Sequence, residues 1–427
     1  MDSRSDKRAI ISWCFFDWAN SAFPTVIVTF VFAAYFTENI SETKEEGTAL
    51  WGYTIGLSGL IIAIVAPVLG AMVDSGWRTK PWLAAFVIIS SLATGALWWV
   101  EADPEFVILS LILIFIANTA FEVGMVFYNS MLGTIAPRSM VGRISGWGWG
   151  LGYLGGLSCL GLLLILFIFD DYAIFTLGSD GAANVRIVGP FVAVWFILFS
   201  IPLFLWTPDP PASTLPSQKT IKHGLLKLYR TFSRIEKFGQ IIRFLVARMF
   251  YNDGLNTLFA FGGIYAAGTF GLNFTELMIF AIAMNIMAGL GSMSFAWADD
   301  RYGAKNIIII CLIGIICATG IIIFTSEIIL FWVICLILGL FVGPIQSASR
   351  SLMVVMSPPE MRAEMFGFFA LSGKVTAFLG PVLLGWVTVM LQSQRLGIAT
   401  VMIFFIIGLI LLLNVKVHEQ EHAGAKS

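Results

Sequence analysis

Charged residues are scarce in this sequence, and hydrophobic residues dominate it. Asp, Glu, Lys and Arg together make up 12% of the 427 residues, whereas hydrophobic residues make up 58%. Apolar sequence continues for roughly 300 residues with short polar interruptions, which is more than a water-soluble domain of this length buries. The composition excludes an ordinary soluble protein and predicts a chain that crosses a membrane many times.

Histidine and cysteine are also rare, and their positions argue against metal sites in the apolar core. The three histidines, His223, His418 and His422, lie outside the apolar segments. The five cysteines lie inside apolar segments, where a thiol behaves as a small apolar side chain. We therefore expect no disulfide, no metal site in the apolar core and no bound cofactor.

Enzyme signatures are missing from the apolar part of the chain. It contains neither the G-x-S-x-G motif of serine hydrolases nor a Cys/His cluster. A G-x-G-x-x-G sequence occurs at 150–155, but no predicted strand precedes it, so it lacks the setting of a dinucleotide site. Its glycines favour close packing of membrane helices instead. We expect a protein that is not an enzyme and has no nucleic-acid partner.

A short polar stretch in the first apolar segment returns far downstream. The sequence D-W-A-N-S-A-F begins at Asp17, and D-G-L-N-T-L-F begins at Asp253. A carboxylate at the centre of a membrane helix costs roughly 2.5–3.5 kcal/mol, so it normally faces a bundle interior or water. On a helix, Asp17 shares one face with Asn20, and Asp253 shares one face with Asn256. The repeat predicts two equivalent polar faces that point to the centre of the molecule.

Twelve apolar segments are long enough to cross a bilayer as helices of about 20 residues or more. We place them at 9–35, 49–73, 81–100, 106–132, 144–169, 187–206, 241–267, 275–298, 306–325, 328–353, 365–390 and 396–414. The sequence thus predicts an all-α polytopic membrane protein.

A polar segment with several prolines divides the predicted spans into two sets of six. We expect an N-terminal half at 1–206, a linker at 207–240 and a C-terminal half at 241–427. Apolar residues recur every three or four positions from Ile221 to Ile235, with basic residues between them. This pattern predicts a basic amphipathic helix on the cytoplasmic membrane surface, or one that packs on the cytoplasmic ends of the two halves.

Lysine and arginine concentrate on one side of the predicted spans. With the N-terminus inside, most basic residues fall in cytoplasmic segments, and only Lys44, Arg186 and Arg395 fall in outer loops. We therefore expect an integral, multi-pass protein with both termini cytoplasmic. The plasma (inner) membrane is the location that we expect for it. Membrane lipids are then its constant partners.

Two loops match each other at equivalent places in the two halves. The sequence reads GAMVDSGWRTK from Gly70 to Lys80, and AWADDRYGAK from Ala296 to Lys305. These loops resemble the signature that follows spans 2 and 8 in the major facilitator superfamily. The stretches at Asp17 and at the seventh span resemble the branch that contains the yeast vacuolar amino-acid effluxers linked to autophagy and their bacterial relatives. The resemblance covers nearly the whole chain.

This resemblance implies a monomeric secondary transporter with twelve helices in two six-helix halves. It implies that the protein moves a small organic solute, an amino acid, outward by alternating access. Proton coupling is a separate hypothesis, which rests on the carboxylates inside the spans. The alternatives are export of another amphipathic metabolite or drug-like compound, and a receptor on the same fold that does not transport.

The resemblance also implies a gate at the two loops. Asp74 would face the start of span 11, and Asp300 the start of span 5, because a carboxylate accepts hydrogen bonds from free amides at a helix N-terminus. The alternative is a pair of solvated turns. The expected gating residues are Gly70, Asp74, Arg78, Asp300, Arg301, Gly303 and Lys305.

Polar residues inside the spans mark the expected solute pathway. The expected substrate or coupling residues are Asp17, Asn20, Asn118, Glu122, Asn129, Asp253, Asn256, Gln346, Arg350 and Lys374. The alternative is that the charged members, together with Arg248, form buried ion pairs that hold the bundle together.

An amino acid needs a cation for its carboxylate and an acceptor for its ammonium group. Arg350, with Lys374, would bind the carboxylate, and Glu122, Asp17 and Asn20 would bind the ammonium group. The solute would then bridge the halves and draw them together. Asp17 or Glu122 would carry the coupling proton.

Overall fold

The computed structural model describes residues 3–168, 182–209 and 238–417, with Gly224, Leu226, Leu228, Tyr229 and Thr231 between them. In these residues all regular secondary structure is helical. The predicted amphipathic helix of the linker lies largely outside them, so the linker and the domain boundaries stay predictions.

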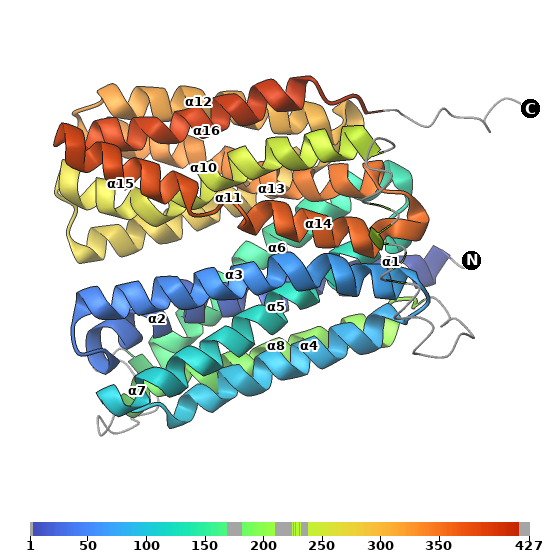
Figure 1. Cartoon of the computed structure of the whole chain (residues 1–427), viewed down its shortest axis with the longest axis horizontal. Helices are drawn as coiled ribbons and strands as arrows, with labels where there is room; N and C mark the ends of the chain where they lie inside the picture. The colour runs from blue at the N-terminus through green and yellow to red at the C-terminus, as the bar shows by residue number, and fades with distance from the viewer. Residues whose placement is uncertain are drawn as a thin grey trace, which may run out of the picture.

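The first six spans come from the first part of the chain (Figure 1). They are α1 (Ser3–Asn20) with η1 (Phe23–Phe30), α2 (Phe32–Tyr35) and η2 (Phe36–Ile40); α3 (Lys44–Asp74); α4 (Thr79–Gly95) with η3 (Ala96–Trp99); η4 (Pro104–Phe106) with α5 (Val107–Ile135); η5 (Arg138–Met140) with α6 (Val141–Leu163) and η6 (Leu164–Ile168); and α7 (Ala183–Arg186) with α8 (Val188–Trp206). We call α1 to α8 the N-terminal set.

The remaining spans form the C-terminal set. They are α10 (Gly239–Phe270), α11 (Phe274–Tyr302), α12 (Ala304–Phe324), α13 (Ile328–Met356), η9 (Pro359–Met361) with α14 (Arg362–Lys374) and α15 (Leu379–Leu391), and α16 (Gln394–Leu413).

Helix α10 differs from the other spans in composition. Among the described residues, eleven helices are long and apolar enough to cross a membrane, and α10 is not one of them. Its 32 residues give sufficient length, but Arg243, Arg248 and Asp253 make it less apolar. The predicted all-α membrane fold is confirmed, and α10 occupies the place of the seventh predicted span.

The predicted spans are correct in order but too short at several ends. The second begins at Lys44 rather than at 49, because the Thr43 side chain caps the helix by accepting from the amide of Glu46. The first continues to Ile40 rather than ending at 35. Pro24 has no N–H to continue the α-helical ladder, and the residues around it form the π-helix η1.

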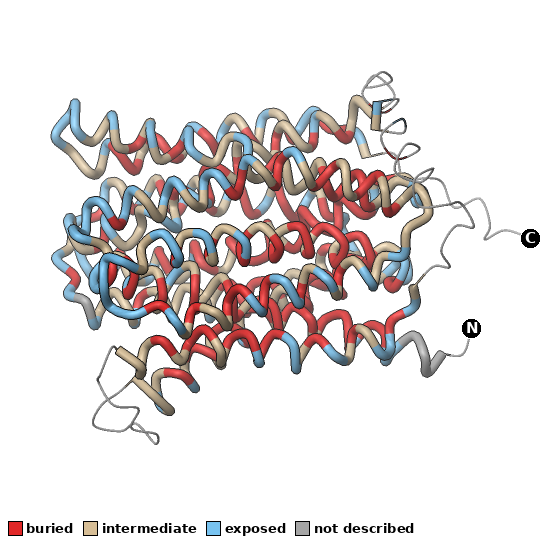
Figure 2. Tube along the Cα trace, turned by 60° about the horizontal axis from the view of Figure 1, so that its bottom comes forward, coloured by how far each residue is buried: buried red, intermediate tan, exposed pale blue. Residues whose placement is uncertain are grey.

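The two sets lie side by side, and both termini lie at one end of the molecule (Figure 1). Across the boundary α3 packs against α14, and α6 packs against α11. Figure 2 shows buried residues where helices meet and exposed ones on the outer turns. Large apolar side chains such as Ile64, 68% exposed, and Val389, 69% exposed, cover the outer faces, as a lipid environment requires.

Candidate functional site

Arg350 of α13 ties the two sets of helices together. It is 2% exposed. Its Nη1 donates to Oδ2 of Asp17 at 3.0 Å and to Oδ1 of Asn129 at 3.3 Å. Its Nε and Nη2 donate to the hydroxyl and the carbonyl of Ser145, at 2.9 and 2.7 Å. These acceptors all belong to the N-terminal set, so Arg350 acts as a bond between the sets.

Aromatic rings seal this ion pair from water. The guanidinium carbon of Arg350 lies 4.7 Å from the ring centroid of Trp13, 5.8 Å from that of Tyr128 and 5.7 Å from that of Trp149. Trp13 and Tyr128 stack at 4.5 Å, and each donates a hydrogen bond to the backbone carbonyl of the other. The rings attract the guanidinium through cation–π contacts. Because they also exclude water, the charges of Arg350 and Asp17 are compensated mainly by each other.

Asp17 and Asn20 belong to this contact rather than to an open pathway. Nδ2 of Asn20 donates to Oδ1 of Asp17 at 3.2 Å, so both carboxylate oxygens of Asp17 have partners. Both residues are buried. For Asp17 and Arg350, the alternative of a buried ion pair describes their state in this conformation.

A second ion pair crosses the boundary in a less enclosed place. Nζ of Lys374, at the end of α14, lies 2.7 Å from Oε1 of Glu122 on α5. The two side chains are 28% and 26% exposed, so this pair is less enclosed than the Arg350 pair. Glu122 and Lys374 are therefore paired with each other, as the alternative of ion pairs within the bundle holds, but they are only partly buried.

The two loop aspartates each bind the start of a helix in the other set. Asp74, at the end of α3, accepts from the amides of Ala363 and Glu364 at 3.2 and 2.8 Å, at the start of α14. Asp300 accepts from the amides of Gly142 and Arg143 at 2.8 and 3.2 Å, at the start of α6. The contacts that the resemblance implied are present, and each places a carboxylate on the positive end of a helix dipole.

Neighbouring groups tighten both contacts. Nη1 of Arg362 donates to the carbonyl of Gly133 across the boundary at 2.6 Å, and Nε of Arg143 lies 3.2 Å from Oδ2 of Asp300. Gly70 packs on the backbone of Ala363, where a Cβ has no room. Gly70 was predicted from the loop sequence, whereas Arg362 and Arg143 were not, because a basic residue in a loop is also what the charge bias alone predicts.

The other expected gating residues make their contacts within one set. Arg78 pairs with Asp209 at 3.5 Å, and Arg301 lies over the ring of Tyr302. Nζ of Lys305 donates to the carbonyls of Leu413 and Val415 at the end of α16. Gly303 has a φ of 87° at the turn between α11 and α12. These residues shape the loops, and Asp74 and Asp300 make the bonds between the sets.

A cavity of about 440 Å³ opens between the two sets. Residues of η1 and α6 line one side, and residues of α10, α11 and α13 line the other. The lining stretch of α13 ends at Gln346, one helical turn before Arg350. The cavity therefore lies on the side of the Arg350 contact away from the Asp74 and Asp300 contacts.

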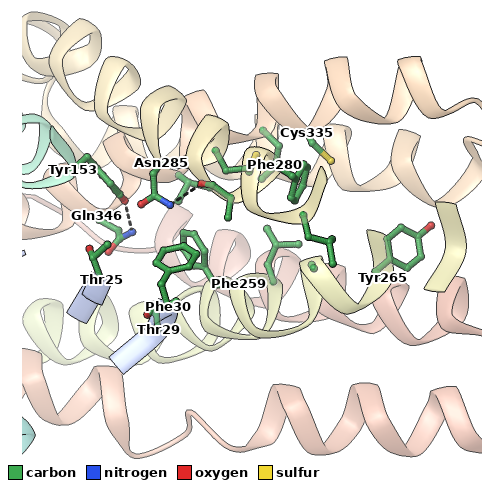
Figure 3. A pocket seen from close by; sticks show the side chains of 18 of the residues that line it. Thr25, Thr29, Phe30, Tyr153, Phe259, Tyr265, Phe280, Asn285, Cys335 and Gln346 are labelled. Carbon is green, nitrogen blue, oxygen red and sulfur yellow. Dashed lines mark hydrogen bonds between the residues drawn. The ribbon is translucent and has the colours of Figure 1, made fainter. Parts of the chain in front are cut away.

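The cavity has a polar end and an apolar body. Figure 3 shows Thr25, Tyr153, Asn285 and Gln346 near one another, with Nε2 of Gln346 3.3 Å from the Tyr153 hydroxyl. The body is lined by apolar side chains such as Phe280. None of the described residues that line this cavity carries a charge. An uncharged, largely apolar part of a solute fits this body.

A second, smaller cavity of about 50 Å³ adjoins the polar end. It shares Trp149 and Gln346 with the main cavity. The polar residues around it are Asn129, Arg248, Asn252, Gln346, Ser349 and Arg350. The charges that the main cavity lacks are thus gathered at its floor.

Three expected pathway residues lie elsewhere. Nδ2 of Asn118 donates to the Ser58 hydroxyl at 2.9 Å in the wall of the N-terminal set. Oδ2 of Asp253 accepts from the amide of Gly380 at 3.1 Å. Asn256 is exposed and lines neither cavity of this conformation, so its part in the pathway stays a prediction.

The chain also carries one metal-binding pattern. The sequence H-E-x-x-H stands at 418–422, and it binds zinc where both histidines lie on one helical face. This segment lies outside the described residues. Within the described residues, no three His, Cys, Asp or Glu side chains are grouped to hold a metal ion.

Known proteins resemble this chain in sequence and in fold. The family model described as "Vacuole effluxer Atg22 like" matches residues 39–424. The uncharacterized MFS-type transporter YxiO of Bacillus subtilis (strain 168) is 25% identical over 410 residues, which cover 94% of this chain and 93% of YxiO. Autophagy-related protein 22 of Coccidioides immitis (strain RS) is 23% identical, over 79% of this chain and 67% of its own.

A solved structure shows the same architecture. The proton:xylose symporter XylE, of the major facilitator superfamily (MFS), aligns with a TM-score of 0.75 over 97% of this chain and 95% of its own, at 13% identity. At that identity the likeness shows the fold, which is the major facilitator fold.

Proposed function

Since this chain belongs to the family of Atg22-like vacuole effluxers, we propose that it exports an amino acid across its membrane by alternating access. It is an integral, multi-pass membrane protein with the major facilitator fold of MFS-type transporters. The observation that carries the proposal is the cavity between the two sets. On the side of the termini, bonds that cross from one set to the other close this cavity.

Alternating access requires a closed side that can open. On the side of the termini, Asp74, Asp300 and Arg350 join the sets, and on the other side the cavity separates them. Rocking of one set against the other breaks these bonds and opens the second side. With both termini cytoplasmic, as the charge bias predicts, the cavity of this conformation faces away from the cytoplasm.

An amphipathic solute matches the distribution of polarity. The apolar body of the cavity suits an apolar side chain, and the polar floor suits charged ends. Arg350 and Lys374 bind Asp17 and Glu122 in this conformation, so a solute reaches them only after these pairs open. We further propose a monomer in the plasma (inner) membrane.

Proton coupling fits Glu122 better than Asp17. Glu122 is partly exposed, whereas Asp17 is sealed beside Arg350. A proton carrier has to reach water during the transport cycle, and the less enclosed carboxylate needs the smaller change to do so. We therefore propose Glu122 as the proton carrier and Lys374 as the cation that it releases on protonation.

Uptake and counterflow in proteoliposomes with a panel of radiolabelled amino acids test the proposal. We expect saturable flux of at least one amino acid, accelerated by the same amino acid on the opposite side. Flux restricted to other amphipathic compounds would favour the metabolite exporter. Saturable binding without any flux would favour the receptor.

A further inference from the structure

Arg248 is a cation at membrane depth that has no carboxylate partner among the residues that the structure describes. The charges of Asp17 and Arg350 compensate each other, as do those of Glu122 and Lys374. Within the described chain no carboxylate lies within 4.0 Å of the Arg248 guanidinium. An uncompensated charge inside a membrane protein is costly and normally marks a site for a substrate or an ion.

One nitrogen of Arg248 holds the side chain in place. Nη1 donates to the carbonyl of Phe369 at 2.7 Å and to the hydroxyl of Ser372 at 2.8 Å. The guanidinium carbon lies 3.5 Å from the centroid of the Phe369 ring. These contacts fix the plane of the guanidinium on α14, close to the negative end of that helix.

The other side of the guanidinium has no such partners. Within the described chain, Nε and Nη2 of Arg248 make no hydrogen bond. These two N–H groups point in parallel, and that edge of a guanidinium binds a carboxylate through two hydrogen bonds. By contrast, all three nitrogens of Arg350 are engaged. Arg248 therefore has a binding edge in this conformation and Arg350 does not.

The position of Arg248 suits a charged group at the end of a solute. It lines the cavity of about 50 Å³ that adjoins the main cavity at Trp149 and Gln346. At ~15 Å³ for each water molecule, this space holds about three waters, or one carboxylate group. The rest of a solute does not fit there, whereas the adjoining main cavity, whose lining Figure 3 shows, has room for it.

We propose that the Nε–Nη2 edge of Arg248 binds the carboxylate of the transported solute, whose apolar body lies in the main cavity. The solute class is an amphipathic monocarboxylate, and an ammonium group is not needed for this contact. The inference rests on the proposed transport function and names the residue that selects the solute. Arg350 then serves as the bond between the sets rather than as the carboxylate site.

Three related probes test the contact by calorimetry on purified protein. They are L-phenylalanine, 3-phenylpropionate, which lacks the ammonium group, and phenethylamine, which lacks the carboxylate. We expect the native protein to bind the first two and to bind phenethylamine roughly tenfold more weakly or worse. The Arg248→Gln variant should lose this preference for carboxylates. The inference would be overturned if Arg248→Gln bound L-phenylalanine and 3-phenylpropionate as tightly as the native protein does.

Matched variants separate binding from folding. Arg243→Gln changes an exposed arginine on the same helix and should leave all three affinities unchanged. Arg248→Lys keeps the charge and one donor to the Phe369 carbonyl but loses the two-point edge, so its affinity for the acids should fall between those of the native protein and Arg248→Gln. It remains informative if Arg248→Gln does not fold. Affinity for the acids at the native level in Arg248→Lys would contradict two-point binding.

The outcomes also distinguish the inference from the function on which it rests. If the native protein transports a solute in proteoliposomes but binds none of the acids, the carboxylate site is wrong and transport stands. If no solute of the panel moves, the transport function itself fails, whatever Arg248 binds.

Discussion

Arg350 and Asp17 give up their hydration where the two sets of helices meet, and each charge stabilises the other. Removing one partner leaves a buried charge without compensation, which typically costs about 3–5 kcal/mol. The cost is specific to the conformation in which the sets are joined, because Arg350 donates only to the N-terminal set there.

A double-mutant cycle measures this coupling. We expect Arg350→Gln and Asp17→Asn each to lower the thermal unfolding midpoint, and the double variant to lower it by less than the sum, because it leaves no unpaired charge. The exposed Arg301→Gln serves as the control. Additive effects of the two substitutions would show that the pair contributes no coupling energy.

Glu122 is the residue at which proton coupling should be visible. Glu122→Gln cannot exchange a proton, so exchange of solute should persist while accumulation driven by a pH gradient disappears. Glu105→Gln, in an exposed turn, is the control. Retention of full gradient-driven accumulation by both Glu122→Gln and Asp17→Asn would refute proton coupling through either carboxylate.

At the scale of elements, the eleventh span is two helices where one was predicted. Helix α14 ends at Lys374, and α15 begins at Leu379. Helix α10 holds both sides of the break, since Arg248 binds the Phe369 carbonyl near the end of α14 and Asp253 accepts from the amide of Gly380 at the start of α15. A cation thus lies at the negative end of one helix and an anion at the positive end of the next.

A methyl group at Gly380 tests how closely α10 must approach the break. A Cβ there collides with Thr257, so Gly380→Ala should destabilise the protein by about 1–3 kcal/mol. Gly385→Ala, on the same helix with nothing within 4 Å, should be neutral. Equal unfolding midpoints of the two variants would mean that this contact is loose.

The break shows how far local sequence carries the prediction. Gly380 and Pro381 stand in the first turn of α15, and Pro381 has no N–H to continue a helix, so the sequence contains a local signal for the interruption that the single predicted span passed over. The acceptor for the Gly380 amide, by contrast, comes from α10, 127 residues away. Pro24 likewise signals the irregular first span, and the Asp74 and Asp300 contacts follow from the repeated loops. Local residues therefore predict where a helix is interrupted but not which partner helix binds at the break.

At the scale of the whole molecule, the balance between the two conformations depends on contacts at one end. A Cβ at Gly70 collides with the backbone of Ala363 in the other set. Gly70→Ala, Asp74→Ala and Asp300→Ala should therefore shift the protein toward the conformation open on the side of the termini. Each charged hydrogen bond is worth about 1.5–3 kcal/mol, so the shift should be about tenfold or more.

Labelling of a cysteine placed at Ser130, which is 7% exposed here, reports this shift. We expect faster labelling from the side of the termini in the three variants, with solute affinity retained. Gly52→Ala lies on the same helix as Gly70, and its Cβ meets nothing within 4 Å, so it should label as the native protein does. Unchanged labelling in all three variants would show that the two loops are ordinary turns and do not form a gate.

The cavity could not be predicted from the sequence, because its lining residues have no distinctive local pattern. Phe280 and Tyr153 line it, but they look like any other residues of apolar helices. Polar residues in the spans were recognisable, yet whether they face the cavity, as Gln346 does, or a partner, as Asn118 does, depends on how twelve helices pack. The sequence therefore predicts the set of polar residues but not the pairs that they form.

Helix α10 has a consequence for how the chain enters the membrane during synthesis. It is less apolar than the other spans. The helices on which it packs, α14 and α16, are translated after it. Arg248 and Asp253 are costly in lipid until those partners arrive. A nascent chain truncated after α13 should therefore leave α10 at the membrane surface, and a glycosylation acceptor placed after α10 would report its delayed crossing.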